Sequence, residues 1–214
     1  MATPTIREVI SAAILSEQKT GQLRARLDGR QTQLSQTLIL PECDPVSALM
    51  IFITGYIESV PSSLSLVSAM SKKMGFHCYA APFLSLAEEY FMHPPKPIAD
   101  AKGLMGLLGE AFLAHRLLEE VNDNHMRHLS RPLLPVDMTE ANTIVHHLIG
   151  DALANHLENL VQYAASQLLA EEKAWEQVRN LPASAVLPQT IVSSEQLMWQ
   201  PHKVRLRMAS YRIL

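Results

Sequence analysis

The chain has 214 residues, of which 48% are hydrophobic and 18% are charged, and its formal net charge is -3. This composition excludes an intrinsically disordered chain, and the small net charge gives no reason to expect nucleic acid or an anionic membrane as a partner. Cys43 and Cys78 lack a metal-type spacing, and no secretory signal opens the chain, so we predict a cytoplasmic protein with free thiols. The apolar run from Val46 to Ile57 is too short to span a bilayer.

The first predicted element is a helix that begins at the Thr3 cap. Apolar residues follow at helical spacing, and the pattern continues as a more exposed segment to about Gln36. Arg24, Arg26 and Arg30 alternate with polar residues in that second half. We interpret this basic cluster as a solvated helix face.

Asp44 and Pro45 form a helix start signal, and the helix that follows is the most apolar in the chain. We expect it to be deeply buried and its region to end at Gly75. Glu58 lies three residues before Pro61, whose missing amide frees a backbone carbonyl. Two interpretations follow: Pro61 opens a second helix and Glu58 ends the first in partial contact with water, or Glu58 is a ligand or base in the core.

The remaining elements are a short helix, two long antiparallel helices and a tail. The short helix covers residues 83–93, and the long ones cover about 100–128 and 137–179. The second long helix begins with Asp137-Met-Thr-Glu140, which resembles a capping box. Residues 204–208 alternate like a basic strand, which we expect to pack along the bundle or on a partner chain.

The two long helices contain a repeat, because residues 108–115 and 149–156 share the order apolar residue, glycine, acid, alanine and histidine. At 100° per residue, the first copy shows an apolar stripe formed by Leu107, Ala111, Ala114, Leu118 and Val121. The same construction gives the second copy a stripe formed by Leu148, Ala152, Asn155 and Asn159. An acid and a histidine flank each stripe. We expect the two faces to meet, either as a packing seam with polar edges or as a polar site.

Acids and histidines that project inward from facing helices are the ligands of metal sites in helical bundles. The candidates for metal ligands are Glu58, Glu110, His115, Glu119, His147, Asp151 and His156. His115 and Glu119 are four residues apart, as are His147 and Asp151, so each pair shares one helix face.

In this outline, residues 44–169 resemble the ferritin-like di-iron bundles, although the chain contains no Glu-x-x-His. His147-x-x-x-Asp151, followed by His156, is similar to the ligand pattern of haem-oxygenase-like metal enzymes. The resemblance implies a metal-dependent, di-iron-type oxidoreductase with iron or manganese as its cofactor.

The alternative is a non-enzymatic helical module that binds a small apolar ligand or a partner protein through a surface rich in leucine and methionine. The chain has no glycine-rich phosphate loop, nucleophile elbow, Cys-x-x-Cys or His-Glu-x-x-His. We therefore predict an all-α multi-helix bundle over residues 1–180 with a short irregular tail over 181–214. We also expect it to form a homodimer.

Overall fold

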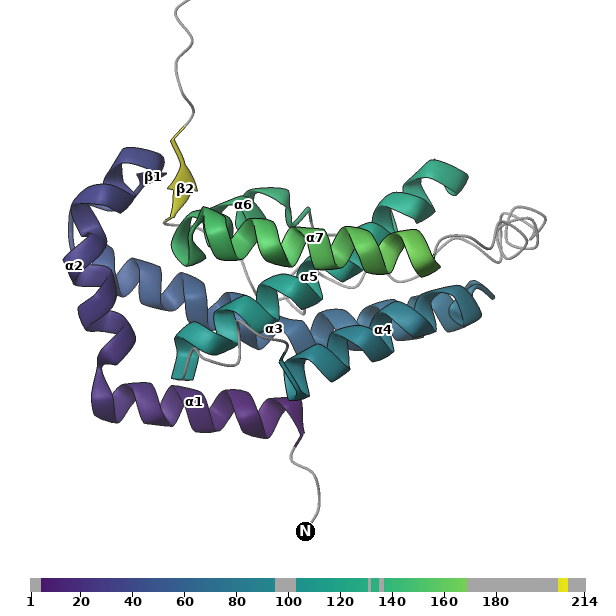
Figure 1. Cartoon of the computed structure of the whole chain (residues 1–214), viewed down its shortest axis with the longest axis horizontal. Coiled ribbons are helices and arrows are strands. Elements are labelled where there is room, and N and C mark those ends of the chain that lie inside the picture. The colour runs from purple at the N-terminus through teal and green to yellow at the C-terminus, as the bar shows by residue number, and fades with distance from the viewer. Residues whose placement is uncertain (1–4, 95–102, 131, 135–136, 169–203, 208–214) are drawn as a thin grey trace, which may run out of the picture.

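The computed structural model describes residues 5–94, 103–130, 132–134, 137–168 and 204–207 (Figure 1). This part of the chain is a multi-helix bundle with one two-stranded sheet, which confirms the predicted all-α class. The elements in chain order are α1 (Ile6–Thr20), α2 (Gln22–Thr37), β1 (Leu38–Ile39), α3 (Pro45–Lys73), α4 (His77–Met92), α5 (Gly103–Leu129), α6 (Thr139–Ile149), α7 (Asp151–Leu168) and β2 (Arg205–Leu206).

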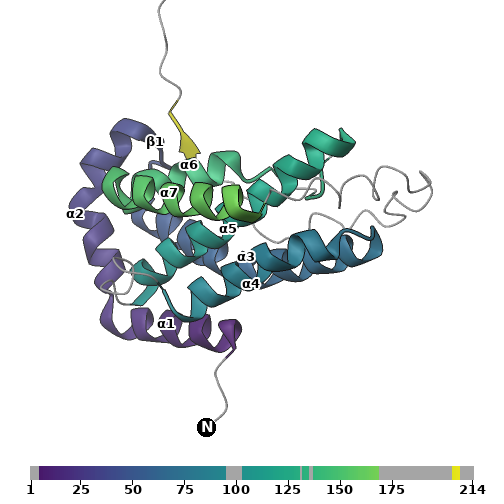
Figure 2. The same ribbon diagram turned by 45° about the vertical axis from the view of Figure 1, so that its right-hand side comes forward.

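Helix α5 lies at the centre of the bundle and packs against α1, α3, α4, α6 and α7. Figures 1 and 2 both show it crossing between the layer of α3 and α4 and the layer of α6 and α7. The predicted stripe on this helix is buried and consists of Leu107, Ala111, Ala114, Leu118 and Val121. The small residues in the stripe let neighbouring helices approach closely, so this face forms the packing seam that its spacing predicts.

The predicted helix to about Gln36 is divided at Gly21 into α1 and α2. Gly21 adopts a left-handed conformation, with φ 60°, which ends α1 and turns the chain. The buried carboxylate of Glu17 then accepts hydrogen bonds from the backbone amides of Leu23 at 3.0 Å and Arg24 at 3.1 Å. These bonds satisfy amides in the first turn of α2, so the break is stabilised by a residue of α1.

Helix α3 is continuous through Pro61, so the interpretation in which Pro61 opens a second helix and Glu58 ends the first is wrong. The alternative fails as well, because Glu58 is exposed and does not lie in the core. Near the proline, the carbonyl of Tyr56 accepts hydrogen bonds from Ser59 Oγ at 2.8 Å and His115 Nε2 at 3.1 Å. These bonds are made to Tyr56, whereas the carbonyl that loses its donor at Pro61 is that of Ile57. The helix continues because Ile57, Val60 and Leu64, on either side of the proline, are buried in the core.

Within the described residues, α3 is the one helix whose length and composition would allow it to cross a membrane, with a mean hydropathy of 1.3 over its most apolar window. The run of apolar residues from Val46 to Ile57 is thus part of a longer apolar helix. This is weak evidence for a membrane span, because a core helix of a soluble protein meets the same criteria. The buried side chains of α3, including Leu49, Ile53 and Val60, pack in the core of the bundle.

Helix α4 begins at His77, six residues before the predicted start at Phe83, and includes Pro82. Its first turns are anchored by Phe76, Tyr79 and Ala80, which are buried in the core. Tertiary packing therefore extends the helix beyond the segment that local spacing predicts.

The predicted helix over residues 137–179 is divided at Gly150 into α6 and α7, and residues 169–179 lie outside the described part. Gly150 has φ 89° and ψ 149°, a conformation that side chains rarely adopt, and it changes the rotational phase of the helix that follows. The predicted second stripe is therefore wrong, because Ala152, Asn155 and Asn159 are exposed. The buried face of α7 consists instead of Ala154, Leu157, Val161, Ala164 and Ala165.

The predicted capping box at the start of α6 does not form. Asp137 Oδ1 accepts a hydrogen bond from the amide of Thr139 at 2.9 Å, but the carboxylate of Glu140 binds the C-terminal segment. That carboxylate accepts from Arg205 Nε at 3.1 Å and from the amide of Leu206 at 3.2 Å.

The strand predicted in the tail is confirmed for Arg205–Leu206, which pairs antiparallel with Leu38–Ile39 of β1. The amide of Arg207 also donates to the carbonyl of Thr37 at 2.8 Å. This segment thus packs on the bundle of its own chain, against β1 and α6. The other residues of the predicted tail domain, 181–203 and 208–214, lie outside the described residues.

The break at Gly150 can be tested by a substitution that adds only a Cβ atom. No atom lies within 4 Å of a Cβ at Gly150 or at Gly29, which is an exposed residue of α2. We expect Gly150→Ala to lower the free energy of unfolding by about 1–3 kcal/mol through backbone strain. The same change at Gly29 should raise it by about 0.5–1 kcal/mol, because alanine favours a helix interior. Urea unfolding measures both, and equal effects would contradict the assigned backbone conformation of Gly150.

Candidate functional site

The structure separates most of the residues that the sequence predicts as metal ligands. Glu110 and His115 are buried in α5, whereas Glu119 and His147 are partly buried. The exposed candidates are Glu58, Asp151 and His156. Within the residues that the structure describes, no group of three or more His, Cys, Asp or Glu side chains could hold a metal ion.

The predicted pair of His147 and Asp151 is divided by the break at Gly150, because one residue lies in α6 and the other in α7. Asp151 instead lies 3.2 Å from the Nε2 atom of His146. The backbone carbonyls of His147 and Leu148 accept hydrogen bonds from Arg30, at 3.4 Å and 2.8 Å. This part of the predicted site thus forms the end of α6, and Arg30 satisfies its carbonyls.

His115 is buried between α5 and α3, and its Nε2 atom lies 3.1 Å from the carbonyl oxygen of Tyr56 and 3.0 Å from Ser59 Oγ. A carbonyl can only accept, so Nε2 carries the proton. Burial lowers the pKa of His115 to about 4, although the hydrogen bond to the Tyr56 backbone opposes this shift. The ring is therefore neutral at pH 7. Its protonated Nε2 cannot take a proton from Ser59, which excludes this Ser–His contact as an activated nucleophile.

A second Ser–His contact joins Ser71 Oγ and His77 Nδ1 at 2.9 Å, near the turn between α3 and α4. The hydroxyl of Ser71 also donates to the carbonyl of Ser68 at 3.1 Å. Ser71 is fully buried, with 0% of its surface exposed, so a substrate cannot reach it in this structure. We interpret this contact as part of the helix packing.

A polar network connects α3, α5, α6 and α7. The buried hydroxyl of Tyr56 donates to Asn142 Oδ1 at 2.7 Å, and Asn142 Nδ2 donates to Glu119 Oε2 at 2.7 Å. Glu119 also pairs with Arg116, which donates from Nε to both carboxylate oxygens of Glu158 at 2.9 Å and 3.1 Å.

The charges in this network stabilise one another. Burial opposes the charge on Arg116, but its bonds to Glu158 and Glu119 outweigh that effect and raise the pKa of the guanidinium. Burial, together with the charge on Glu119, raises the pKa of Tyr56, so its hydroxyl stays protonated and able to donate.

Two predicted residues, His115 and Glu119, line the same cavity of about 400 Å³ beside the start of α6. Asp123 and Asp137 line it as well. The oxygens of Glu119 bind Arg116, Asn142 and Thr139, and Asp137 accepts from the amide of Thr139. Glu119 is thus already used in holding α5 and α6 together, and Asp137 in capping the start of α6, which favours a structural role for these two carboxylates.

Glu110 is the buried acid that has no partner in the described structure. Its side chain is 7% exposed, and its Oε2 atom has no hydrogen-bond partner among the described residues. Burial raises its pKa to about 7. A protonated carboxyl avoids most of the free energy needed to bury a charge, so Glu110 is held partly neutral near pH 7.

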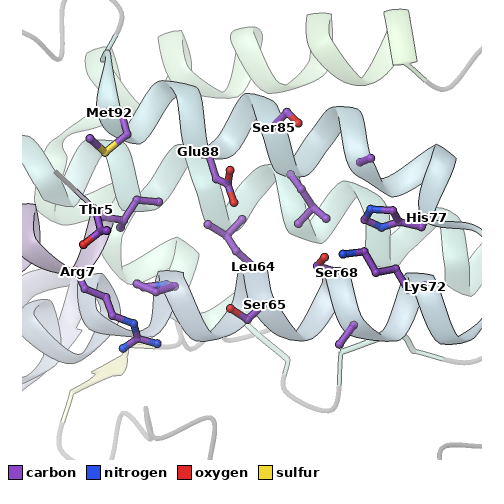
Figure 3. Close-up of a pocket in the computed structure, with 15 residues that line it drawn as sticks. Thr5, Arg7, Leu64, Ser65, Ser68, Lys72, His77, Ser85, Glu88 and Met92 are labelled. Carbon is purple, nitrogen blue, oxygen red and sulfur yellow. The ribbon is translucent and has the colours of Figure 1, made fainter. Parts of the chain in front are cut away.

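A groove between α3 and α4 was not predicted from the sequence. It encloses about 970 Å³, and the start of α1 closes one end (Figure 3). Leu64 and Glu88 point toward one another across it, while Lys72 and His77 lie at the end away from Thr5 and Arg7. Its walls contain several serines and alanines, and these residue types do not identify a binding site in a sequence. Their helical spacing indicates a shared helix face and was the only feature of the sequence that could have pointed to the groove.

Comparisons with known proteins identify no relative of this chain. The chain matches no protein-family model, and no curated protein or solved structure is significantly similar to it. The resemblance to ferritin-like and haem-oxygenase-like bundles therefore stays a prediction. The functional argument rests on the groove, the network and the cavity described above.

The pH dependence of the free energy of unfolding should reveal the raised pKa of Glu110. Its pKa is 4.5 when unfolded and about 7 in the fold, so the native state holds an extra proton between these values. The contribution of Glu110 to the free energy of unfolding is full below pH 4.5. It falls by up to about 3 kcal/mol as the pH rises to 7. His115 acts oppositely, because its pKa falls from 6.5 to about 4 on folding, so its contribution is lost as the pH falls through that range.

In Glu110→Gln the contribution of Glu110 disappears and that of His115 remains. We expect the free energy of unfolding of this variant, relative to the native chain, to rise steadily from about pH 4.5 to pH 7. Urea unfolding across this range measures the difference. Glu58→Gln, which changes an exposed glutamate, is the control and should leave the native curve unchanged. Parallel curves for Glu110→Gln and the native chain would contradict the raised pKa.

The polar network should stabilise the bundle measurably. Tyr56→Phe removes the hydroxyl that donates to Asn142 and leaves a buried amide oxygen without that donor. We expect the free energy of unfolding to fall by about 1–3 kcal/mol. Tyr163→Phe is the matched control, because Tyr163 is 68% exposed and its change should stay within about 0.5 kcal/mol. Equal midpoints in urea for the two variants would show that the bond between Tyr56 and Asn142 contributes little.

Proposed function

We propose that this protein is a non-enzymatic helical binding module whose groove between α3 and α4 takes an apolar-faced ligand. The observation that carries the proposal is the groove itself, with a volume of about 970 Å³. Ligand sites in proteins are concave, largely apolar and lined by a few polar groups that fix orientation. Here Ile6, Pro61 and Met92 supply partly exposed apolar surface, and the largely buried Leu64 and Leu84 also line the groove.

The polar side chains of the groove support the same proposal. Arg7, Lys72 and Glu88 are exposed, so a ligand can reach all three from solvent. By contrast, His115 and Glu119 of α5 are engaged in helix packing. A binding role thus uses the surface that is open, and the buried groups keep a structural role.

The metal-dependent oxidoreductase predicted from the sequence stays untested. Measurement of iron and manganese in the purified protein separates the two functions. A metal-free protein that remains folded agrees with the binding module. Stoichiometric iron or manganese that Glu110→Gln or Asp151→Ala removes, without unfolding the chain, would contradict it.

Filling the groove should abolish ligand binding. Ser68 lines the groove and is partly exposed, so Ser68→Trp places a large ring there without removing a core side chain. Nile red serves as an apolar fluorescent probe, and we expect Ser68→Trp to weaken its binding by about tenfold or more, which corresponds to at least about 1.4 kcal/mol. Ser16→Trp, on the exposed surface of α1, should leave binding unchanged. Equal dye affinities for the two variants would overturn the proposed site.

A further inference from the structure

The groove has the form of a helix-packing site from which one helix is missing. One wall consists of residues that recur along α3 at steps of three and four: Pro61, Leu64, Ser65, Ser68, Ala69 and Lys72. Residues at these steps lie on one face of a helix. Apart from Leu64, which is buried at its edge, that face differs from the one that α3 buries through Tyr56, Val60 and Val67. Helix α3 therefore presents a second packing face to the groove.

Helix α4 repeats this arrangement on the opposite wall. Its lining residues also recur at steps of three and four: His77, Ala81, Leu84, Ser85, Glu88 and Met92. The two helices run side by side and are joined by a short turn (Figures 1 and 2). Two faces with helical period that border one groove provide the surface on which a third helix packs.

The dimensions of the groove suit a short helix. From Pro61 to Lys72, the lining stretch of α3 rises about 16 Å, which is three helical turns. Ser65, Ser68 and Ala81 have small side chains, so a third helix could approach to the usual interaxial distance of about 8–10 Å. A flat or large ligand would not interlock with side chains that recur at steps of three and four along both walls.

The charges of the groove indicate which charges its occupant carries near its two ends. Arg7 lies at one end, and Lys72 lies with His77 at the other. Glu88 is the single acid among the described lining residues and lies between these ends. An occupant with acidic side chains near both of its ends would pair with Arg7 and Lys72. The groove is as long as the stretch from Pro61 to Lys72, so two acids about eleven residues apart match its length and lie on the same face of a helix.

We propose that the groove between α3 and α4 binds an amphipathic helix of a partner protein, about three turns long, with an acidic residue near each end. The inference rests on the proposed function, because it names the occupant of the same groove. The apolar face of the partner helix packs on Leu64 and Leu84, which line the groove, and its two acids lie near Arg7 and Lys72.

Charge reversal tests this inference with the full chain. The probes are three synthetic helical peptides of about fourteen residues that share one apolar stripe and carry Glu, Gln or Lys at two positions eleven apart. Fluorescence anisotropy at low salt should rank their affinities Glu above Gln above Lys. In the double variant Arg7→Glu with Lys72→Glu the order should reverse, with about tenfold weaker binding of the Glu peptide.

Lys73→Glu is the matched control for Lys72→Glu, because Lys73 is also exposed in the last turn of α3 but does not line the groove. This variant should keep the order of the native chain. Equal affinity for the three peptides overturns the inference. If no peptide binds while Nile red binding still depends on Ser68, the inference fails and the proposed function stands. If dye binding does not depend on Ser68 either, both fail.

A second copy of this chain is the occupant that competes with a partner helix in this test. Light scattering across a range of protein concentrations measures the predicted homodimer. A dimer that Ser68→Trp dissociates, together with peptide affinity that falls as the protein concentration rises, would assign the groove to a second copy and overturn the inference. Dimer formation that leaves the peptide ranking unchanged would locate the dimer interface elsewhere and support it.

Discussion

The burial of α5 between Leu104 and Leu118 is the constraint on which the other helices depend. A buried polar side chain of this helix cannot reach water, so it either finds a partner on a neighbouring element or, like Glu110, is held partly neutral. His115 donates to the backbone of α3, and Glu119 connects to Tyr56 of α3 through Asn142 of α6. Arg116 binds Glu158 of α7. These directional bonds fix how α3, α6 and α7 dock, whereas apolar contacts alone would permit several packings.

The sequence predicts those features of the fold that depend on neighbouring residues. The buried stripe of α5 and the start of α3 at Asp44 follow from spacing and capping, and both are present. The phase of α7 does not follow, because apolar spacing continues across Gly150 as if the helix were unbroken. Whether a glycine continues a helix or ends it depends on its backbone conformation, and residue spacing carries no information on that.

The candidate site shows a different limit of sequence reasoning. Acids and histidines were selected because their side chains can bind metals, yet the same groups also satisfy buried polar atoms. The partners of His115 lie in α3, more than fifty residues earlier in the chain, so the sequence could not distinguish a ligand from a packing group. The groove was missed for the opposite reason. Serine and alanine at helical spacing indicate a helix face, but they do not indicate that the face is left open.

The two faces of α3 explain why the groove can bind without a large change of structure. On its buried face, the hydroxyl of Tyr56 donates to Asn142 of α6, and the carbonyl of Tyr56 accepts from His115 of α5. These contacts fix the position of α3 from the inside and leave Ser65 and Ala69 exposed on the opposite face. Association is less favourable when a surface must first become ordered. A groove whose wall is already held by a buried network avoids that ordering, so its small residues can meet a partner helix in a preformed arrangement.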